Sequence, residues 1–297
     1  MKKKLRVATT RSPPASFAAA LEVLFAPSRG LWRCINVEST LTLARVCTAS
    51  RRALRAWLDA AAADLSLGKE TLPVLMQLPG TTFHAQLHAA LQLLHDFTYA
   101  TSVQLPDGHK LPAGLQQKDD EQCQRVLRGR QVQVIVAQCK GKGWGVLAAQ
   151  QIEQGAFVGE YTGELVSSRE MRRRYRERYD AQELNYVLSL REHVARRDSA
   201  ALHFDVVRTN VDATGVGSLT RFFNHSCRPT TFVAAVRVDS FVPRLALFAR
   251  RCIETGEELT FDYGDGTSGA DSQGGGGHPC RCGAPECRGY LPGGSGS

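Results

Sequence analysis

Residues 221–229 read Arg-Phe-Phe-Asn-His-Ser-Cys-Arg-Pro, which places a histidine and a cysteine two positions apart among polar neighbours. A second cysteine group lies near the end of the chain, where Cys280, Cys282 and Cys287 fall within eight residues. Structural zinc in proteins prefers four tetrahedral ligands, so these three thiolates need a fourth partner. Cys227 is the expected partner because clustered histidine and cysteine are unusual in a plain core, and the alternatives are His225 and His278. The sequence therefore predicts a zinc site at Cys227, Cys280, Cys282 and Cys287.

The size and composition of the chain indicate a globular protein. It has 297 residues, of which 43% are hydrophobic, enough for one large domain or two modest ones. No apolar run approaches the roughly 18 to 20 residues that a membrane span requires, and no signal-peptide pattern follows the N-terminus. We therefore expect a soluble protein without membrane contact. The formal charge of +8 favours attraction to nucleic acid or acidic protein surfaces, with a plain solvated basic surface as the alternative.

The character of the sequence changes along the chain. Residues 1–125 carry helical spacing, for example at Leu87, Leu91 and Leu94, and predict a helical N-terminal domain. Residues 130–264 contain short β-type runs separated by glycine-rich turns. A flexible Gly/Ser-rich linker is expected at residues 265–277, before a zinc knuckle at residues 278–293. The predicted class is α+β, with a mostly β domain between a helical domain and the knuckle.

The N-terminal domain carries two weaker patterns. Leucines in residues 21–24 and 41–58 give a pattern that resembles an F-box, which implies a protein partner for this domain. A helical domain of unassigned role is the alternative. His84 and His88 share a helix face at i and i+4, but without a third ligand we expect them to be structural.

An arginine-rich helix is expected at residues 168–179, within the β region. This run predicts either a contact with nucleosomal DNA or a solvated helix face. Its arginines are Arg169, Arg172, Arg173, Arg174, Arg176 and Arg178.

Five motifs follow one another between residues 130 and 292. They are Gly-Lys-Gly-Trp-Gly-Val at 141–146, Glu-Tyr-Thr-Gly-Glu at 160–164, Arg-Phe-Phe-Asn-His-Ser-Cys at 221–227, Gly-Glu-Glu-Leu-Thr-Phe-Asp-Tyr at 256–263, and the terminal cysteines. Their order resembles that of SET-domain protein-lysine methyltransferases. Residues 236–249 are most similar to the histone H3 lysine 9 class and to the related SET domain fused to a transposase. The cysteine-rich pre-SET region of that class is missing, since only Cys123 and Cys139 lie near its expected place.

The resemblance implies a SET fold, with short curled sheets and a knot-like C-terminal segment, and S-adenosylmethionine as the cofactor. It also implies a histone H3 tail lysine as the substrate and a nuclear, chromosomal location. A non-histone protein substrate is one alternative, and a catalytically silent chromatin or adaptor module is another. The resemblance places the cofactor against Lys142, Gly143, Trp144, Tyr186, Arg221, Asn224, His225 and Tyr263.

The chemistry needs a neutral lysine amine to attack the sulfonium methyl group. With a pKa near 10.4, only about one lysine in a few thousand is neutral at pH 7, and a narrow apolar channel beside a positive charge favours the neutral form. By resemblance, Tyr263 is the catalytic tyrosine that orients the amine, and Tyr186 borders the site. Phe261 takes the position of the family's product switch. Phenylalanine cannot hold the water that a tyrosine would bind there, so di- or trimethyl-lysine is the expected product.

Two positions depart from the family pattern. Ser218 stands where an asparagine usually follows the glycine, and Thr230 stands where an asparagine usually follows the proline. Because Ser218 can still hydrogen-bond locally, we expect tuned activity rather than its loss.

Overall fold

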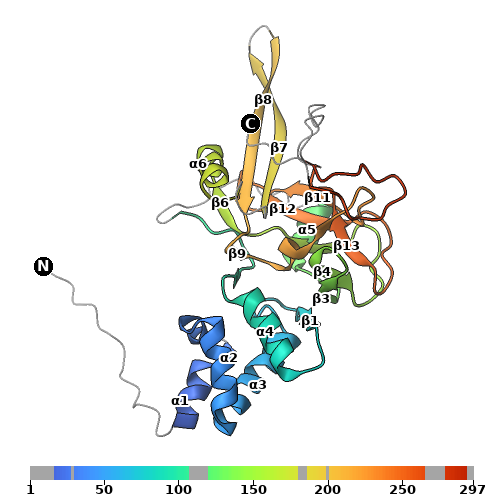
Figure 1. The fold of residues 1–297 in the computed structure, drawn as a ribbon. Coiled ribbons are helices and arrows are strands. Elements are labelled where there is room, and N and C mark those ends of the chain that lie inside the picture. The colour runs from blue at the N-terminus through green and yellow to red at the C-terminus, as the bar shows by residue number, and fades with distance from the viewer. Residues whose placement is uncertain are drawn as a thin grey trace, which may run out of the picture.

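The computed structural model describes residues 17–27, 30–106, 120–179, 186–198, 201–264 and 278–292. Helices dominate up to residue 95, and strands dominate beyond residue 130 (Figure 1). This division agrees with the α+β class predicted from the sequence. The predicted linker at residues 265–277 lies outside the described residues.

The N-terminal region is built from amphipathic helices whose apolar faces pack together. Leu87 and Leu91, on which the helical spacing was recognised, are both fully buried. The Asn36 side chain accepts a hydrogen bond from the Ser39 amide at 2.7 Å and so caps the second helix. None of the helices within the described residues is long and apolar enough to cross a membrane. The elements are α1 (Phe17–Leu24), the 3-10 turn η2 (Leu31–Cys34), α2 (Val37–Val46), α3 (Thr48–Ala63) and α4 (Phe83–Leu94).

Two sheets form the body of the second region. One has the order β1-β3-β4-β13-β10, and the other has the order β11-β12-β5. The parallel pair β10 and β13 sets Asn224 opposite Thr260 and His225 opposite Phe261, so two motifs far apart in sequence lie side by side. The strands are β1 (Leu75–Met76), β3 (Val134–Cys139), β4 (Gly143–Ala148), β5 (Phe157–Glu160), β10 (Asn224–His225), β11 (Thr231–Val236), β12 (Arg244–Ala249) and β13 (Glu258–Phe261).

A third sheet, of order β6-β8-β7, carries a long hairpin that extends beyond the body (Figure 1). Helix α6 lies beside its base and continues into the single π-helical turn η3, so the helix predicted at 168–179 is present. Asp212, which is buried, accepts hydrogen bonds from Arg174 at 2.7 Å and from Tyr179 at 2.5 Å, and these bonds hold the helix to the sheet. The elements are β6 (Glu164–Val166), α6 (Ser168–Arg174), η3 (Tyr175–Tyr179), β7 (Val187–Asp198) and β8 (Ala201–Asp212).

The N-terminal helices and the β region share one hydrophobic core. Strand β1 pairs in parallel with β3, and β2 (Thr98–Tyr99) pairs in parallel with β9 (Val216–Gly217). The buried Arg130 guanidinium binds the Glu70 carboxylate at 2.8 Å and adds a polar link between the two regions. The boundary predicted near residue 125 is therefore crossed by strand pairing, core packing and an ion pair. Two short elements complete the fold, α5 (Glu121–Arg128) and the 3-10 turn η4 (Leu219–Phe222).

Candidate functional site

An aromatic cluster lies at the C-terminal end of β13. The Tyr263 ring is 4.8 Å from the Phe261 ring and 5.3 Å from the His225 ring, measured between centroids. The Phe261 side chain is buried, whereas Tyr263 is 38% exposed and can therefore be reached from outside. The Tyr263 hydroxyl donates to the Phe223 carbonyl at 3.0 Å. Burial, followed by the neighbouring Tyr186 and Glu258, raises the pKa of Tyr263 above its ordinary value, so the hydroxyl stays protonated at neutral pH.

Tyr161 is a member of this cluster to which the sequence analysis gave no role. Its ring lies 6.2 Å from that of Phe261, and its hydroxyl donates to the Tyr186 carbonyl at 2.7 Å. Burial, together with the nearby Tyr263, raises its pKa well above the ordinary value. The site thus has two neutral tyrosines whose rings both lie close to the ring of one phenylalanine. Tyr161 lies within a recognised motif, but its burial and its contact with Tyr186 arise from tertiary packing, which the motif does not reveal.

The glycine-rich turn before β4 lies beside this cluster. Gly143 has a φ of 75°, and a side chain added there would meet no atom within 4 Å, so the backbone borders open space. Gly145 differs, because an added Cβ would come within 3 Å of Cys139, Asn224 and Glu258. A glycine can allow close approach of a ligand to the backbone or close packing within the protein. The geometry fits the first role at Gly143, whereas close packing within the protein requires the glycine at Gly145.

Glu258 connects the turn to the Asn-His motif. Its carboxylate forms an ion pair with Lys142 and accepts a hydrogen bond from the Asn224 side chain at 2.8 Å. The same Asn224 amide group donates to the Trp144 carbonyl at 3.2 Å. The Glu258 carboxylate, which the sequence analysis did not single out, therefore holds the predicted cofactor residues Lys142 and Asn224, and Asn224 in turn holds the backbone of Trp144.

The guanidinium group of Arg221 contacts aromatic rings and backbone carbonyls of the protein next to the cluster. Its guanidinium stacks 4.1 Å from the centre of the Tyr186 ring and 4.3 Å from that of the Phe97 ring. It also donates to the Ala213 carbonyl at 2.9 Å and to the Thr214 carbonyl at 3.2 Å. This arrangement suits Arg221 to positioning Tyr186.

The two departures from the family pattern have local partners. The Ser218 hydroxyl donates to the Glu160 carbonyl at 2.7 Å, so Ser218 forms the local hydrogen bond that we expected. The Thr230 hydroxyl donates to the Glu258 carbonyl at 3.0 Å and accepts from the Thr260 amide at 2.8 Å. Both side chains therefore satisfy buried backbone groups close to the site.

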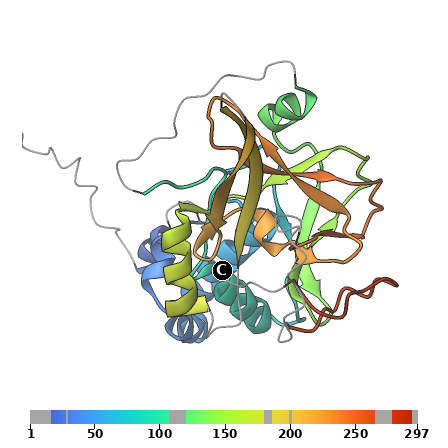
Figure 2. The same cartoon turned by 90° about the horizontal axis from the view of Figure 1, so that it is seen from above.

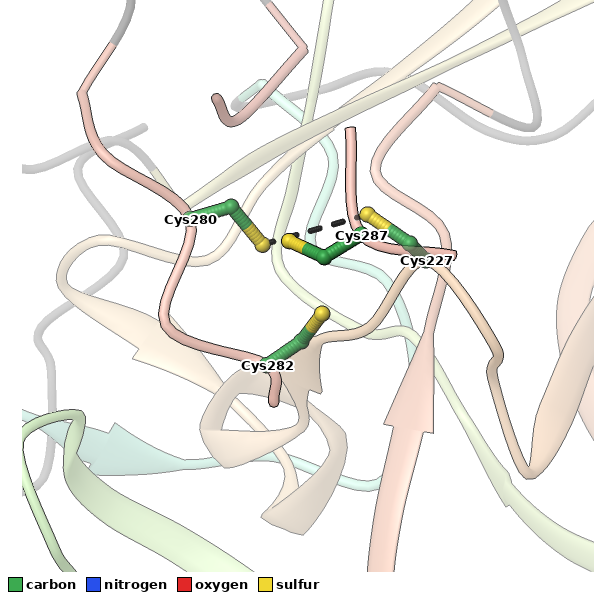
Figure 3. Close-up of side chains that lie close together, drawn as sticks. All are labelled: Cys227, Cys280, Cys282 and Cys287. Atoms are coloured by element: carbon green, nitrogen blue, oxygen red, sulfur yellow. Dashed lines mark hydrogen bonds between the residues drawn. The ribbon is translucent and has the colours of Figure 1, made fainter. Parts of the chain in front are cut away.

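Four cysteine sulfurs converge beside the cluster (Figure 3). The Sγ atoms of Cys227, Cys280, Cys282 and Cys287 all lie within 4.8 Å of one another, and the pair Cys227 and Cys280 is 3.9 Å apart. Tetrahedral zinc with bonds of about 2.3 Å would hold its sulfurs about 3.8 Å apart. The four-cysteine set therefore fits zinc. His225, an alternative ligand, has its Nε2 3.4 Å from Cys227 Sγ and lies behind that sulfur rather than in the set.

Backbone amides around the cysteines favour thiolates. The amides of Arg288 and Gly289 donate to the sulfurs of Cys227 and Cys287, each at 3.4 Å. Burial raises the pKa of Cys282, but hydrogen bonds from the backbone and the neighbouring thiols outweigh it and lower the pKa to about 6. Burial raises the pKa of Cys280 to about 12, and a bound cation would offset the cost of ionising this thiol.

The knuckle docks on the predicted cofactor loop and on the Tyr263 segment through two arginines. Arg281 donates to the Gly141 carbonyl at 3.0 Å, next to the open space at Gly143. Arg288 binds the Asp262 carboxylate at 2.7 Å, one residue before Tyr263. Through these two contacts the zinc site and the aromatic cluster are parts of one assembly. In both views the knuckle, in red, lies apart from the blue helices α1–α3 (Figures 1 and 2).

The comparisons with known proteins agree with the resemblance to SET domains. The family model for the SET domain matches residues 143–264, which confirms the resemblance. The methyltransferase domain of human histone-lysine N-methyltransferase SETMAR has a similar solved structure, with a TM-score of 0.58 and 26% identity, covering 77% of this chain and 97% of that one. Arabidopsis thaliana SUVH6, solved in complex with SAM, has a TM-score of 0.54 and 20% identity, covering 78% of this chain and 56% of that one, and so shows the fold alone.

Among curated proteins, the chain resembles histone-lysine N-methyltransferases. Rat SETMAR is 39% identical over 175 residues, covering 56% of this chain and 53% of that protein. SUV39H2 of Xenopus tropicalis is 38% identical over 163 residues, covering 51% of this chain and 37% of that protein. The chain therefore spans about half the length of the rat relative, and less of the frog protein.

Proposed function

We propose that this chain is an S-adenosylmethionine-dependent protein-lysine N-methyltransferase. The observation that carries the proposal is the pair of neutral hydroxyls, Tyr161 and Tyr263, beside Phe261 and next to the open backbone at Gly143. The similarity to curated histone-lysine N-methyltransferases supports the same activity.

The residues present fit the proposed cofactor. Gly143 leaves room for a ligand against the backbone, and the adjacent Lys142 is bound by Glu258, which also binds Asn224. Asn224 donates to the Trp144 carbonyl. When bound, S-adenosylmethionine would supply an electrophilic methyl group on a sulfonium. We propose Lys142, Gly143, Trp144, Tyr186, Asn224, His225 and Tyr263 as its binding residues, with Arg221 holding Tyr186 in place.

The chain's own residues would prepare the lysine. Because burial keeps Tyr161 and Tyr263 protonated, neither acts as a base at neutral pH, and each can orient an amine by hydrogen bonding. The buried Phe261 ring offers an apolar wall that disfavours the ammonium form. We propose Tyr263 as the catalytic tyrosine and Tyr161 as its partner in holding the amine.

We propose that the substrate is a lysine on the histone H3 tail, and that the protein acts on chromatin in the nucleus. The printed names of several relatives specify histone lysine. One of them, from Candida albicans, is H3 lysine-36 specific and is 38% identical over 175 residues, covering 59% of this chain and 18% of that protein. We further propose di- or trimethyl-lysine as the product, because Phe261 offers no hydroxyl to bind a water in the channel.

A DNA contact through α6 and η3 belongs to the same proposal. Arg173 forms ion pairs with Glu170 and Glu177, and Arg174 is committed to Asp212 and neighbouring carboxylates. The remaining arginines are exposed and have no carboxylate partner within the described part of the chain. These four are Arg169, Arg172, Arg176 and Arg178. The first three are spaced three and four residues apart and form a row on one helix face that suits phosphate groups.

The test is to incubate the protein and S-adenosylmethionine with nucleosomes and with an array of histone and non-histone peptides. Fragment mass spectrometry then locates the methyl groups and counts them. We expect methyl-lysine on H3, with di- or trimethyl-lysine dominant at long times. Methylation confined to non-histone peptides would reject the substrate, and no methylation of any peptide by zinc-loaded protein would reject the activity.

A further inference from the structure

A cavity of about 880 Å³ is lined by residues of α2, α3 and α4 and of the turns before α3 and α4. These three helices belong to the N-terminal region (Figure 1). The lining includes Arg45, Arg51 and His84 together with the apolar Ala44 and Phe83, and it contains no carboxylate. Its volume falls in the range of roughly 300–1,000 Å³ that is usual for ligand sites. A concave site whose charged lining is entirely basic calls for an anionic ligand.

Arg51, which lines this cavity, and Arg55, which lies one helical turn further along α3 beside it, both contact an aromatic ring instead of acids. The guanidinium carbons of Arg51 and Arg55 lie 5.6 Å and 4.3 Å from the centre of the Phe83 ring. The two residues are one helical turn apart on α3, a spacing at which like charges repel. Neither has a carboxylate partner among the described residues. Stacking on Phe83 fixes both guanidinium groups and leaves their N–H donors available, as a site for a multiply charged anion requires.

A third arginine approaches from α2. Arg45 Nη2 lies 3.3 Å from His84 Nε2, so the ring nitrogen accepts from the guanidinium and the remaining donors of Arg45 stay free. Helices α3 and α4 begin at Thr48 and Phe83, and both residues line the cavity. The partial positive charge of two helix starts adds to that of the arginines.

We propose that this arginine pocket, formed by Arg45, Arg51, Arg55 and His84 around Phe83, binds a phosphorylated side chain of a partner peptide. A phosphate dianion matches several fixed guanidinium groups, and arginine clusters are the general means of recognising it. The pocket is concave and includes the apolar Ala44 and Phe83 in its lining, which suits one side chain flanked by apolar residues. Duplex DNA, by contrast, fits the exposed row on α6. The inference goes beyond methyl transfer and does not depend on it.

The test uses the full chain and a fluorescent peptide with one phosphoserine between leucines, compared with its unphosphorylated twin by fluorescence anisotropy. We expect the phosphopeptide to bind at least about tenfold more tightly than its twin, and inorganic phosphate to compete. The double variant Arg51→Ala/Arg55→Ala should remove that preference. Arg52→Ala is the matched control, because Arg52 is exposed on the same helix and has no recorded contact with Phe83.

Thermal melts of each variant, followed by circular dichroism, distinguish loss of binding from loss of folding. The double variant Arg51→Lys/Arg55→Lys keeps the charges and removes the guanidinium groups, so it tests whether stacked guanidinium groups are needed or positive charge is enough. Equal affinity for the two peptides, no binding of either, or an equal loss in Arg52→Ala would overturn the proposal. It would also be overturned if a short DNA duplex, but not the phosphopeptide, lost affinity in the double alanine variant.

Discussion

The zinc knuckle and the central sheet contribute to one site, but they are held together by different forces. In the sheet, Val146 of β4, Leu247 of β12 and Leu259 of β13 are fully buried. In the knuckle, none of the described residues 278–292 is buried. Burial of an apolar side chain contributes about 1.5–3 kcal/mol, a source of stability that the knuckle lacks. It is held instead by its cysteines and by the docking contacts of Arg281 and Arg288.

The difference indicates that the knuckle and the sheet, which both contribute to the candidate site, are stabilised independently of one another. Binding of structural zinc contributes roughly 10–16 kcal/mol in small zinc-finger peptides at neutral pH. A comparable contribution here would stabilise the knuckle but leave the sheet unaffected. The two parts can therefore be perturbed independently.

Removal of zinc should have the largest effect on activity. We expect chelation, or Cys287→Ser, to abolish methyl transfer while the main thermal transition of the sheet persists, because the knuckle has no buried core of its own. Metal analysis measures the zinc content, and circular dichroism measures the thermal transition of the sheet. Cys34→Ser, at an exposed cysteine far from the cluster, should change neither. Active protein without zinc would contradict the metal assignment. Unfolding of the sheet on chelation would show that the sheet and the knuckle are not stabilised independently.

The next effect should come from the sheet side of the site. Tyr263→Phe deletes one hydroxyl and keeps the ring, so we expect turnover to fall roughly a hundredfold with little change in melting temperature. Cofactor binding, measured by calorimetry, should persist. Turnover close to that of the parent would mean that Tyr263 is not at the point of methyl transfer.

A smaller effect is expected at the contact between the two parts. Arg288→Ala removes the bond to Asp262, a charge-assisted contact at an exposed position, and should raise the KM for the cofactor about three- to tenfold. Zinc content should stay the same, because Arg288 is not one of the four proposed ligands, although its amide and its side chain both interact with the Cys227 sulfur. The control is Arg228→Ala, whose guanidinium is 3.9 Å from Glu286 at the surface. An equal change in the KM for the cofactor in both variants would show that Arg288 has no specific role in docking the knuckle.

The smallest rate change is expected at Phe261. A substitution there should change the methylation state of the product but hardly change the rate of the first transfer. Phe261→Tyr adds a hydroxyl that can hold a water in the channel, so the product should shift toward monomethyl-lysine. The first transfer should stay within a few-fold of the parent rate. Time courses of the three methyl states by mass spectrometry decide the matter, and identical distributions at saturating cofactor would remove Phe261 from this role.

Much of this arrangement was predictable because it is encoded in short motifs. The order of the five motifs indicated the SET domain, and the cysteine spacing indicated a metal site before any coordinates. The helix at 168–179 followed from its charge and length. Each motif by itself lies within about a dozen neighbouring residues, where local spacing constrains the chemistry, and the order of the motifs along the chain supplied the rest.

What could not be predicted depends on tertiary packing. Glu258 gains its importance from Lys142 and Asn224, which lie 116 and 34 residues away along the chain. Tyr161 enters the site because strand packing buries its ring against Phe261. The sharing of one core between the helices and the β region likewise has no local signature, so the sequence indicated a simpler division at residue 125.

The pairing of β1 with β3 has a practical consequence for anyone who cuts the chain. A fragment that starts at residue 130 would lose β1 and leave the β3 side of the sheet as a bare edge, with the fully buried Val134 and Val136 uncovered. Unpaired edges of this kind invite strand addition from other copies. Aggregation of such a fragment would therefore report a missing neighbour rather than a defective catalytic unit, and adding back residues 70–106 should restore solubility before it changes any rate.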